Sequence, residues 1–450
     1  MQARNCTWRS TGFWLGLVLT SLAALSSHAS AQSLREAVEQ ATTTNPEVLV
    51  TTNRRLAADQ GLKQANAGYL PRVDLTAGVG PERLNSLDSR AAGLSDTTIN
   101  RRDAALTLSQ MLFDGFAVKS EVARQQARID SAAYGVATTA EDIALRVIGA
   151  YLEVLRRQET VAAAIDNLNI HQRIHEQIRM RSESGVGRRA DFDQAEGRLA
   201  FANANLRMEQ GSLRDAQVAY LRVVGTSPRM LQKPASPAHS LPSSENLALE
   251  TALANHPAIK SAEADVAGTD AQLNSARAAL SPRLDLELGA NSGRDAVHGR
   301  TDDVTLMLRV RYNLSRGGAD QARINEAYFQ LEEAREILGR TRRQVAESIS
   351  LAFNAHLTSR DRLASLKRYV EAADATREAY AKQFSIGQRT LLDLLNSENE
   401  FFSARIEYLA GVYLELGSMF RVFAGMGLLL DTLEIAPPAE AAGPSRKVQR

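Results

Sequence analysis

The stretch that decides the fold runs from Val304 to Leu314 and reads Val-Thr-Leu-Met-Leu-Arg-Val-Arg-Tyr-Asn-Leu. Every second side chain is apolar, and the side chains between them include Arg309, Arg311 and Asn313. Such alternation predicts a β-strand with one apolar and one polar face, because successive side chains of a strand point to opposite sides. Three other segments alternate in the same way, the second more weakly, and they start near Val73, Leu106 and Leu284.

The length of these segments distinguishes two classes of sheet protein. Each covers roughly 8 to 12 residues, about the length of a tilted transmembrane β-strand. Hairpins at about 72–113 and about 283–314 would give four strands per chain. Open edges are not tolerated in lipid, and barrels need at least about eight strands. Membrane strands of this chain would therefore need several copies to close a barrel, and three copies would supply about twelve strands.

The alternative is a pair of soluble hairpins packed on helices. The charged alternates Asp285, Glu287, Arg309 and Arg311 would then face solvent. This arrangement leaves the apolar face of each hairpin in need of a cover.

The sequence contains an internal repeat. Pro46 and Pro71 are 25 residues apart, and so are Pro257 and Pro282. The landmarks that follow each pair recur in the same order, which indicates a tandem duplication. We expect a first repeat at 32–225, a Pro/Ser linker at 226–246, a second repeat at 247–431 and a disordered tail at 432–450.

Each repeat is expected to contain a very long helix. No proline interrupts the run from Val118 to Ser184, which as a helix would extend about 100 Å. Its apolar residues follow heptad spacing, at Val147, Tyr151, Val154, Val161, Ile165 and Leu168. The first repeat turns near Gly187 and the second near Gly387, so both should form antiparallel helical hairpins of coiled-coil type. A soluble periplasmic coiled-coil adaptor or scaffold is an alternative, but an adaptor would need a lipoyl-like β-domain between its helices, and none is visible.

The N-terminal 31 residues are typical of a secretory signal peptide. Arg4 and Arg9 precede an apolar run of 13 residues, and Ala29-Ser30-Ala31 offers a cleavage site before Gln32. The alternative, an N-terminal anchor helix, is disfavoured because about 20 apolar residues are needed to span a bilayer. The single cysteine, Cys6, lies before this site, so we expect no lipid anchor on the new N-terminus.

The composition excludes several functions. There are 53 Lys and Arg against 52 Asp and Glu, and this balance argues against a nucleic-acid partner. One cysteine excludes a disulfide framework and a thiolate-rich metal site. His171 and His175 lack the glutamate of H-E-x-x-H and a third ligand. The glycine pattern that begins at Gly185 follows a charged helical run rather than the strand that a dinucleotide site requires. We therefore predict no catalytic residue, no cofactor and no metal site, and expect that the protein is not an enzyme.

Taken together, these features resemble the TolC family of outer-membrane efflux proteins over nearly all of 32–431. The specific marks are the duplication, the Leu70-Pro71 strand opening, the Leu112-Phe113-Asp114-Gly115 strand exit and the run from Phe384 to Leu395. The resemblance implies a mainly α chain with membrane β-structure, in a homotrimer whose 12-stranded barrel continues into a long α-helical coiled-coil tunnel. It also implies a passive duct in the outer membrane of a Gram-negative bacterium, in contact with outer-membrane lipid. The tunnel would lie in the periplasm and dock a periplasmic adaptor (membrane fusion) protein and an inner-membrane ABC or other transporter.

Site residues follow from the same resemblance. Asp393 matches the acid of a pore ring, whereas the second ring position falls on Asn396, which halves the ring charge. The two lie on one helix face, and threefold symmetry would close that face into a constriction. Arg389, Phe384 and Asp193 match a gate latch within and between chains. The tips that would contact the adaptor are Gly185, Val186, Gly187, Ile386 and Gly387. The alternative for each charge is a solvated helix surface.

Two kinds of cargo are compatible with such a duct, secreted proteins and small molecules. The predicted signal peptide without a lipid-anchor cysteine favours a duct for type I secretion of proteins. Small-molecule or drug efflux through the same kind of duct is the alternative.

Overall fold

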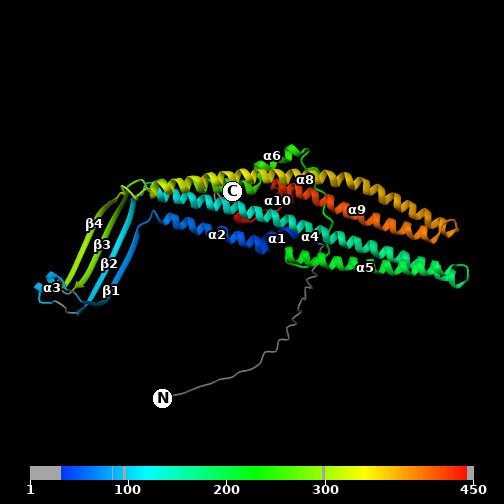
Figure 1. The fold of residues 1–450 in the computed structure, drawn as a ribbon, viewed down its shortest axis with the longest axis horizontal. Coiled ribbons are helices and arrows are strands. Elements are labelled where there is room, and N and C mark those ends of the chain that lie inside the picture. The colour runs from blue at the N-terminus through cyan, green and yellow to red at the C-terminus, as the bar shows by residue number, and fades with distance from the viewer. Residues whose placement is uncertain (1–31, 84, 95–97, 296–298, 443–450) are drawn as a thin grey trace, which may run out of the picture.

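A four-stranded sheet forms one end of an elongated chain, and long helices extend from it to the other end (Figure 1). The structure is a computed structural model that describes residues 32–83, 85–94, 98–295 and 299–442. The predicted signal peptide and its cleavage residues Ala29 and Ala31 lie outside the described residues, so that cleavage stays a prediction.

The two halves contain the same helices in the same order. Each begins with an 11-residue helix, α1 (Leu34–Thr44) and α6 (Glu245–Asn255), followed by a 22-residue helix, α2 (Pro46–Ala67) and α7 (Pro257–Ala278). Proline opens the second helix of each half, after an N-cap side chain that accepts a hydrogen bond from the helix backbone. A 67-residue helix follows the strands, α4 (Ala117–Glu183) and α8 (Ala319–Ser385), and a 36-residue helix returns, α5 (Arg189–Val224) and α9 (Leu391–Met426).

The four predicted strands are confirmed and form one antiparallel sheet in the order β1-β2-β3-β4. Their bounds are β1 (Arg72–Arg83), β2 (Thr98–Phe113), β3 (Arg283–Asp295) and β4 (Gly299–Arg311). The last strand ends at Arg311, so the expected extension to Leu314 is wrong: the backbone leaves the ladder before Gly317 and Gly318, which adopt left-handed conformations. A short helix, α3 (Leu87–Ala91), lies in the connection between β1 and β2 and was not foreseen.

The predicted long hairpins are confirmed. α4 packs along α5, and α8 packs along α9, while α7 lies between α4 and α8 and joins the halves. The first half of the expected heptad stripe is confirmed as the buried face of α4, because Val147, Tyr151 and Val154 are fully enclosed. Its second half is not: Val161 and Leu168 are half-buried, and Ile165 is exposed. The main core lies at mid-bundle, where α1, α4, α5, α6, α8 and α9 all contribute buried side chains.

The Pro/Ser segment between the halves, residues 226–246, is held against this core by backbone and side-chain contacts. Its Leu231 forms a parallel bridge with Gln32, the first described residue. The hydroxyl of Tyr151 donates to the backbone oxygens of Gln32 and Gln232 at 2.7 and 2.6 Å. This hydroxyl thus fastens the first described residue and the connecting segment to the longest helix of the first half.

The expectation of a disordered tail at 432–450 is wrong for its described part. The chain forms α10 (Leu429–Thr432) and continues to a short 3-10 turn at Ala439–Ala441 that packs against α4 and α2. Ile435 is buried in the main core, and Glu434 pairs with Arg35 of α1. The prolines suggested disorder, but buried apolar residues between them fasten this part to the bundle. Residues 443–450 lie outside the described residues.

Candidate functional site

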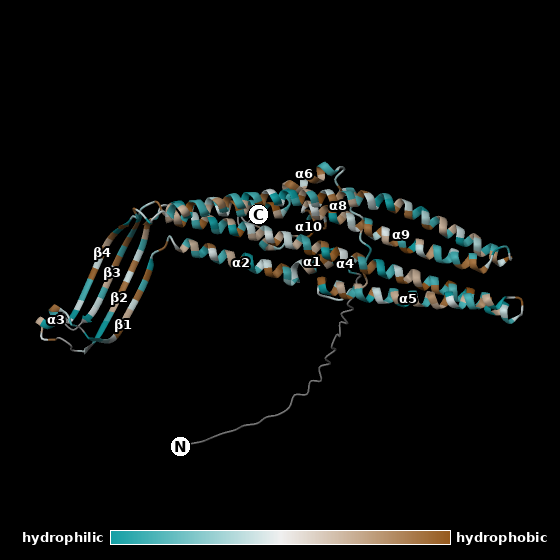
Figure 2. Cartoon of the chain, in the orientation of Figure 1, coloured by the Kyte–Doolittle hydropathy of each residue, from teal (hydrophilic) through white to brown (hydrophobic). Residues whose placement is uncertain are grey.

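One face of the sheet is apolar and open to the surroundings. Partners across the strands place Val73, Leu108, Leu288 and Leu306 in one row, and the next row is Leu75, Leu106, Ala290 and Val304. Val304 and Leu75 are about three quarters exposed. A soluble monomer rarely leaves so large an apolar face uncovered. In Figure 2 the strands show brown, hydrophobic residues that alternate with white and teal ones.

The opposite face carries paired charges. Asp285 is almost fully buried, and its carboxylate accepts hydrogen bonds from Arg283 at 2.9 Å and Arg311 at 3.0 Å. Glu287 accepts from Arg309 and Arg311, each at 2.7 Å. The four charged alternates seen in the sequence therefore neutralise one another on a polar face. A sheet with one lipid-like and one water-like face fits a membrane wall around an aqueous lumen.

The far ends of the helical hairpins present apolar side chains on tight turns. Gly185 and Gly387 adopt left-handed φ angles of 76° and 78°, which end α4 and α8. Val186 comes directly after Gly185, Ile386 comes directly before Gly387, and the two side chains are 84% and 68% exposed. Gly187 accompanies Val186, and both of their amides donate to the Arg181 carbonyl. The five predicted tip residues thus lie on two turns, one at the end of each hairpin.

Asp393 has a structural task at the start of α9. Its carboxylate accepts hydrogen bonds from the Thr390 hydroxyl at 2.9 Å and the Thr390 amide at 3.2 Å, which completes a capping box. These bonds from Thr390 hold the pKa of Asp393 below its usual value. The side chain is still partly exposed, so its negative charge stands one turn from the tip.

Asn396 lies one turn further along the same helix and is exposed. Its amide oxygen accepts a hydrogen bond from Arg198 of α5 at 3.2 Å. The residue expected at the second ring position thus links the two hairpins of one chain.

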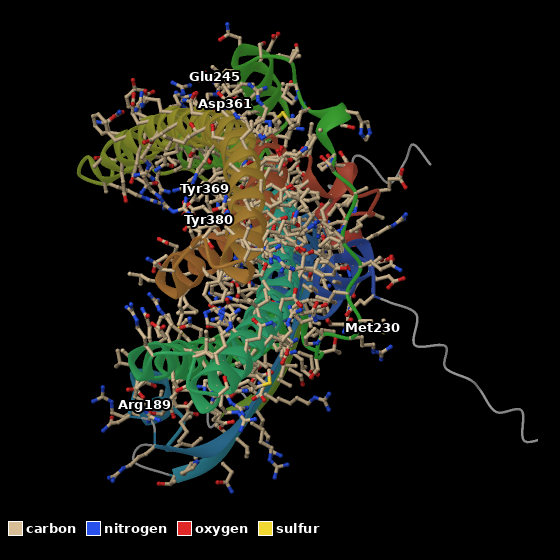
Figure 3. The ribbon with its side chains drawn as sticks, turned by 90° about the vertical axis from the view of Figure 1, so that its right-hand side faces the viewer. Arg189, Met230, Glu245, Asp361, Tyr369 and Tyr380 are labelled. Atoms are coloured by element: carbon tan, nitrogen blue, oxygen red, sulfur yellow. The ribbon has the colours of Figure 1, made fainter. Side chains whose placement is uncertain are left out.

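The three predicted latch residues do not meet within the chain. Asp193 pairs with Arg189 on its own helix at 3.1 Å. Arg389 stacks on Tyr380 at 4.2 Å and donates to Gln383. Figure 3, which faces the hairpin tips, shows Arg189 and Tyr380 on different hairpins. An intrachain latch between Arg389 and Asp193 is therefore wrong for this structure, because each side chain is satisfied by a neighbour on its own hairpin. A contact between subunits stays a prediction.

Phe384 makes a different contact from the one expected. It is 8% exposed and packs in an apolar cluster with Ile174, Leu394 and Leu395. The guanidinium of Arg181 lies 5.1 Å from the centre of its ring. A cation over an aromatic face is attracted by the ring quadrupole, so Arg181 ties the first hairpin to the second.

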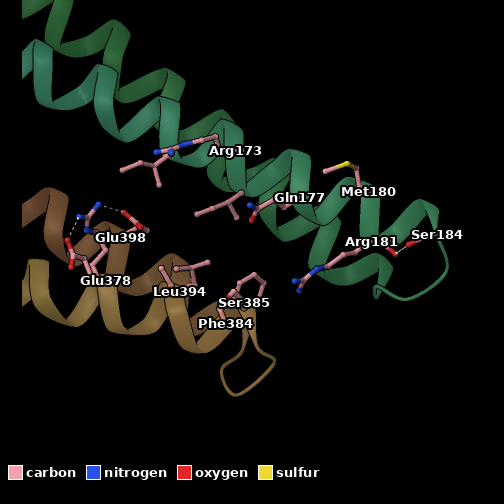
Figure 4. Close-up of a pocket in the computed structure, with 14 residues that line it drawn as sticks. Arg173, Gln177, Met180, Arg181, Ser184, Glu378, Phe384, Ser385, Leu394 and Glu398 are labelled. Atoms are coloured by element: carbon pink, nitrogen blue, oxygen red, sulfur yellow. Dashed lines mark hydrogen bonds and ion pairs between the residues drawn. The ribbon is translucent and has the colours of Figure 1, made fainter.

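Sequence reasoning missed a charged cavity beside this contact. It encloses about 640 Å³, and the side chains that line it include Arg173, Arg181, Arg377, Phe384 and Glu398 (Figure 4). Glu398 is 5% exposed, and burial raises the pKa of its carboxyl while Arg377 and Arg173 oppose that shift. No motif marks these residues, because they come from helix positions some two hundred residues apart that meet only after folding.

The histidine pair is structural. His171 is buried, and its Nδ1 is 2.9 Å from the Asn167 carbonyl oxygen, while burial lowers the pKa of its imidazole. His175 packs its ring on Phe192. In the part of the chain that the structure describes, no cluster of three or more His, Cys, Asp or Glu side chains has the geometry to hold a metal. Within the same residues, none of the helices has the length and apolar character needed to cross a membrane.

Comparisons with known proteins agree with this geometry. The profile of the family described as outer membrane efflux protein matches residues 37–226 and 248–413. The chain is 26% identical to the outer membrane efflux protein BepC of Brucella suis, over 87% of this chain and 83% of BepC. It is 25% identical to the proteases secretion protein PrtF of Dickeya chrysanthemi, over 87% of each chain. The fold matches the crystal structure of the Campylobacter jejuni CmeC outer membrane channel with a TM-score of 0.77 and 15% identity, covering 92% of this chain and 88% of that one.

The expected fold class is confirmed: four strands and long helices form the subunit of a trimeric 12-stranded outer-membrane barrel with a helical tunnel. The expected place in the outer membrane of a Gram-negative bacterium is confirmed as well. Because the profile covers most of both halves, the chain belongs to the outer membrane efflux protein family, the TolC family of channel proteins.

Proposed function

We propose that this channel is the outer membrane duct of a type I protein secretion system. The observation that carries the proposal is the sheet with one apolar and one charged face. Its strands lead into α4 and α8, which are long enough to extend far into the periplasm. Efflux channels of this family serve tripartite export systems. The likeness to a protein named for the secretion of proteases, over most of both chains, supports a polypeptide cargo.

The partners would dock on the hairpin tips. Val186 and Ile386 are exposed apolar residues on turns whose backbone is fixed by left-handed glycines. Such residues bury little within the chain but offer apolar area to an adaptor. We therefore place a periplasmic adaptor on the two tips, with an inner-membrane ABC transporter behind it.

The gate would form where three copies bring their tips together. Asp393 and Asn396 would face the pore, with one formal negative charge per chain. Arg389 and Asp193 are each held by partly exposed pairs on their own hairpins, which are weak in water. They could therefore exchange partners with a neighbouring subunit at little cost in free energy, and Phe384 would hold the second hairpin in register.

Deletion of the gene in its own bacterium, with plasmid complementation, tests the cargo. If the proposal is right, the deletion removes specific polypeptides from the culture medium, and the full-length chain restores them. A secretome that stays unchanged while drug susceptibility rises would refute the polypeptide cargo.

That second outcome would support small-molecule efflux, which the likeness to the outer membrane efflux protein BepC favours. A complementing variant with Val186→Asp and Ile386→Asp should restore neither phenotype, since it places charge on both docking tips. Val218→Asp is a matched control, because Val218 is a similarly exposed valine on α5 that lies far along the chain from either tip.

A further inference from the structure

Three arginines lie side by side across the outer end of the sheet. The strand register places Arg102 of β2 opposite Arg294 of β3, and Arg294 opposite Arg300 of β4. All three are exposed. Directly opposite residues of an antiparallel pair point to the same face, with β-carbons about 5 Å apart. The three guanidinium groups therefore rise from one row of the sheet.

This row belongs to the apolar face. Side chains alternate along a strand, so Arg102 shares its face with Leu106, and Arg300 shares its face with Val304. Arg101, one position before Arg102, points to the opposite face and pairs there with Glu82 at 3.0 Å. The arginine row thus continues the lipid-facing surface beyond its last apolar residues.

The row carries excess positive charge. Arg300 binds Asp302 at 2.9 Å, and Asp302 also accepts a hydrogen bond from Ser292 at 2.7 Å. Among the described residues, the side chains of Arg102 and Arg294 find no hydrogen-bond or ion-pair partner, although their backbones belong to the strand ladder. Like charges directly opposite each other destabilise a sheet. Two facing arginines without an acid on the same row therefore call for an anion from outside the chain.

The height of the row matches the outer surface of a membrane. Ten residues separate Val310, near the helical end, from Arg300. At about 3.4 Å per residue and a tilt of about 40°, the row lies about 26 Å above Val310. An apolar barrel band is about 25 Å tall. The strands turn hydrophilic toward the end next to α3 (Figure 2), and their outer halves contain no Trp, Tyr or Phe that would form an aromatic girdle.

The surface around the row has the shape that a lipid would need. A shallow hollow of about 480 Å³ is lined by Arg102, Arg294 and Arg300, and one acid, Asp103, is also among its lining residues. A second hollow of about 300 Å³ lies below it and is lined mainly by apolar residues, among them Leu75, Leu106 and Val304, although Asp302 and Asp303 also line it. Positive charge thus stands above an apolar depression on one face.

We propose that this row binds the phosphorylated headgroup of an outer-leaflet lipid, with acyl chains lying along the apolar hollow. Arginine is suited to this role because its planar guanidinium donates two parallel hydrogen bonds to a phosphate. Arg102 and Arg294 supply the uncompensated charge, and Arg300, held by Asp302, marks the edge of the site. The lipid fixes the depth at which the barrel sits.

Native mass spectrometry of the detergent-solubilised trimer tests the site. The probe is bisphosphorylated lipid A, titrated against the wild type and against the double variant Arg102→Gln, Arg294→Gln. Each lost charge-assisted hydrogen bond weakens binding about tenfold, so the double variant, which loses two arginines, should bind about a hundredfold more weakly. Arg101→Gln, at the same depth on the lumen face, should bind as the wild type does.

Two further arms separate the sources of phosphate and guard against misfolding. Dephosphorylated lipid A should bind the wild-type trimer about as weakly as the intact lipid binds the double variant. Inorganic phosphate at millimolar concentration should not displace the intact lipid, because it lacks the acyl chains. Equal binding of phosphorylated and dephosphorylated lipid by the wild type would overturn the proposal, and this comparison needs no variant. Full displacement by inorganic phosphate would overturn the lipid as occupant.

Discussion

Replacement of Arg181 by glutamine should loosen the closed end of the channel. Arg181 lies on α4 and its guanidinium stands 5.1 Å from the ring of Phe384 on α8, so the contact joins the two hairpins of one chain. The ring of Phe384 is buried but Arg181 is exposed, and a cation–π contact with such a solvent-exposed cation contributes about 0.5–1 kcal/mol. If three subunits open together, the change totals about 1.5–3 kcal/mol per trimer. The ratio of open to closed channels should then rise about 10-fold to 150-fold.

Single-channel recording in planar bilayers measures this ratio directly. The matched control is Arg179→Gln, two positions away, because Arg179 pairs with Glu176 and Glu183 on its own helix and contacts no second hairpin through those bonds. The control should leave the open fraction unchanged. An open fraction for Arg181→Gln equal to that of the wild type, or an equal rise in both variants, would refute the role of this contact as a tie between hairpins.

Three other predictions concern the mid-bundle and the tip. Glu141 accepts hydrogen bonds from the amides of Leu429 and Leu430, and burial raises the pKa of its carboxyl to about 7. Because the folded state resists ionisation of this carboxyl, the free energy of unfolding should fall by up to about 3 kcal/mol as the pH rises from about 4.5 through 7. Glu141→Gln should flatten this slope in thermal melts at pH 5–8. Gly427→Ala should lower the melting temperature by several degrees, because φ at this residue is 70° and an added Cβ would stand 2.6 Å from Pro257. Gly135→Ala is the control, because its added Cβ meets open space in α4 and should not lower the melting temperature. Equal melting temperatures for the two variants would contradict the reasoning. Asn396→Asp should raise the preference for cations over anions in reversal-potential measurements, because it doubles the formal negative charge of the predicted ring at positions 393 and 396. An unchanged reversal potential would remove position 396 from the pore.

Periodicity made the elements of the fold predictable. The alternation from Val304 to Val310 and the heptad spacing through Tyr151 can be read from residues close together in the sequence. Each spacing places the apolar side chains on one face of a strand or helix, which is enough to predict the element. The repeated Pro46 and Pro257 marked helix starts because proline fits the first turn.

The contacts at the candidate gate were not predictable in the same way. Arg198 and Asn396 are 198 residues apart and meet only because two hairpins lie side by side. Asp193 pairs with Arg189 four residues earlier on its own helix, and Arg389, in the turn before α9, pairs with Asp393 on its own hairpin, so neither needs the contact that the sequence suggested. The tail misled for another reason: its prolines suggested disorder, whereas the burial of Ile435 depends on a core that the local sequence does not show.

The most direct test of the central claim is the labelling of single cysteines along β4. The only native cysteine is Cys6, so a Cys6→Ser background gives clean labels. In liposomes, Val304→Cys, Leu306→Cys and Leu308→Cys should be protected from a water-soluble maleimide, and probes attached there should be quenched by lipid-borne quenchers. Thr305→Cys, Met307→Cys and Arg309→Cys should react with the maleimide and escape that quenching. Alternation with a period of two is the result that a membrane wall around an aqueous lumen predicts, and equal labelling at all six positions would contradict it.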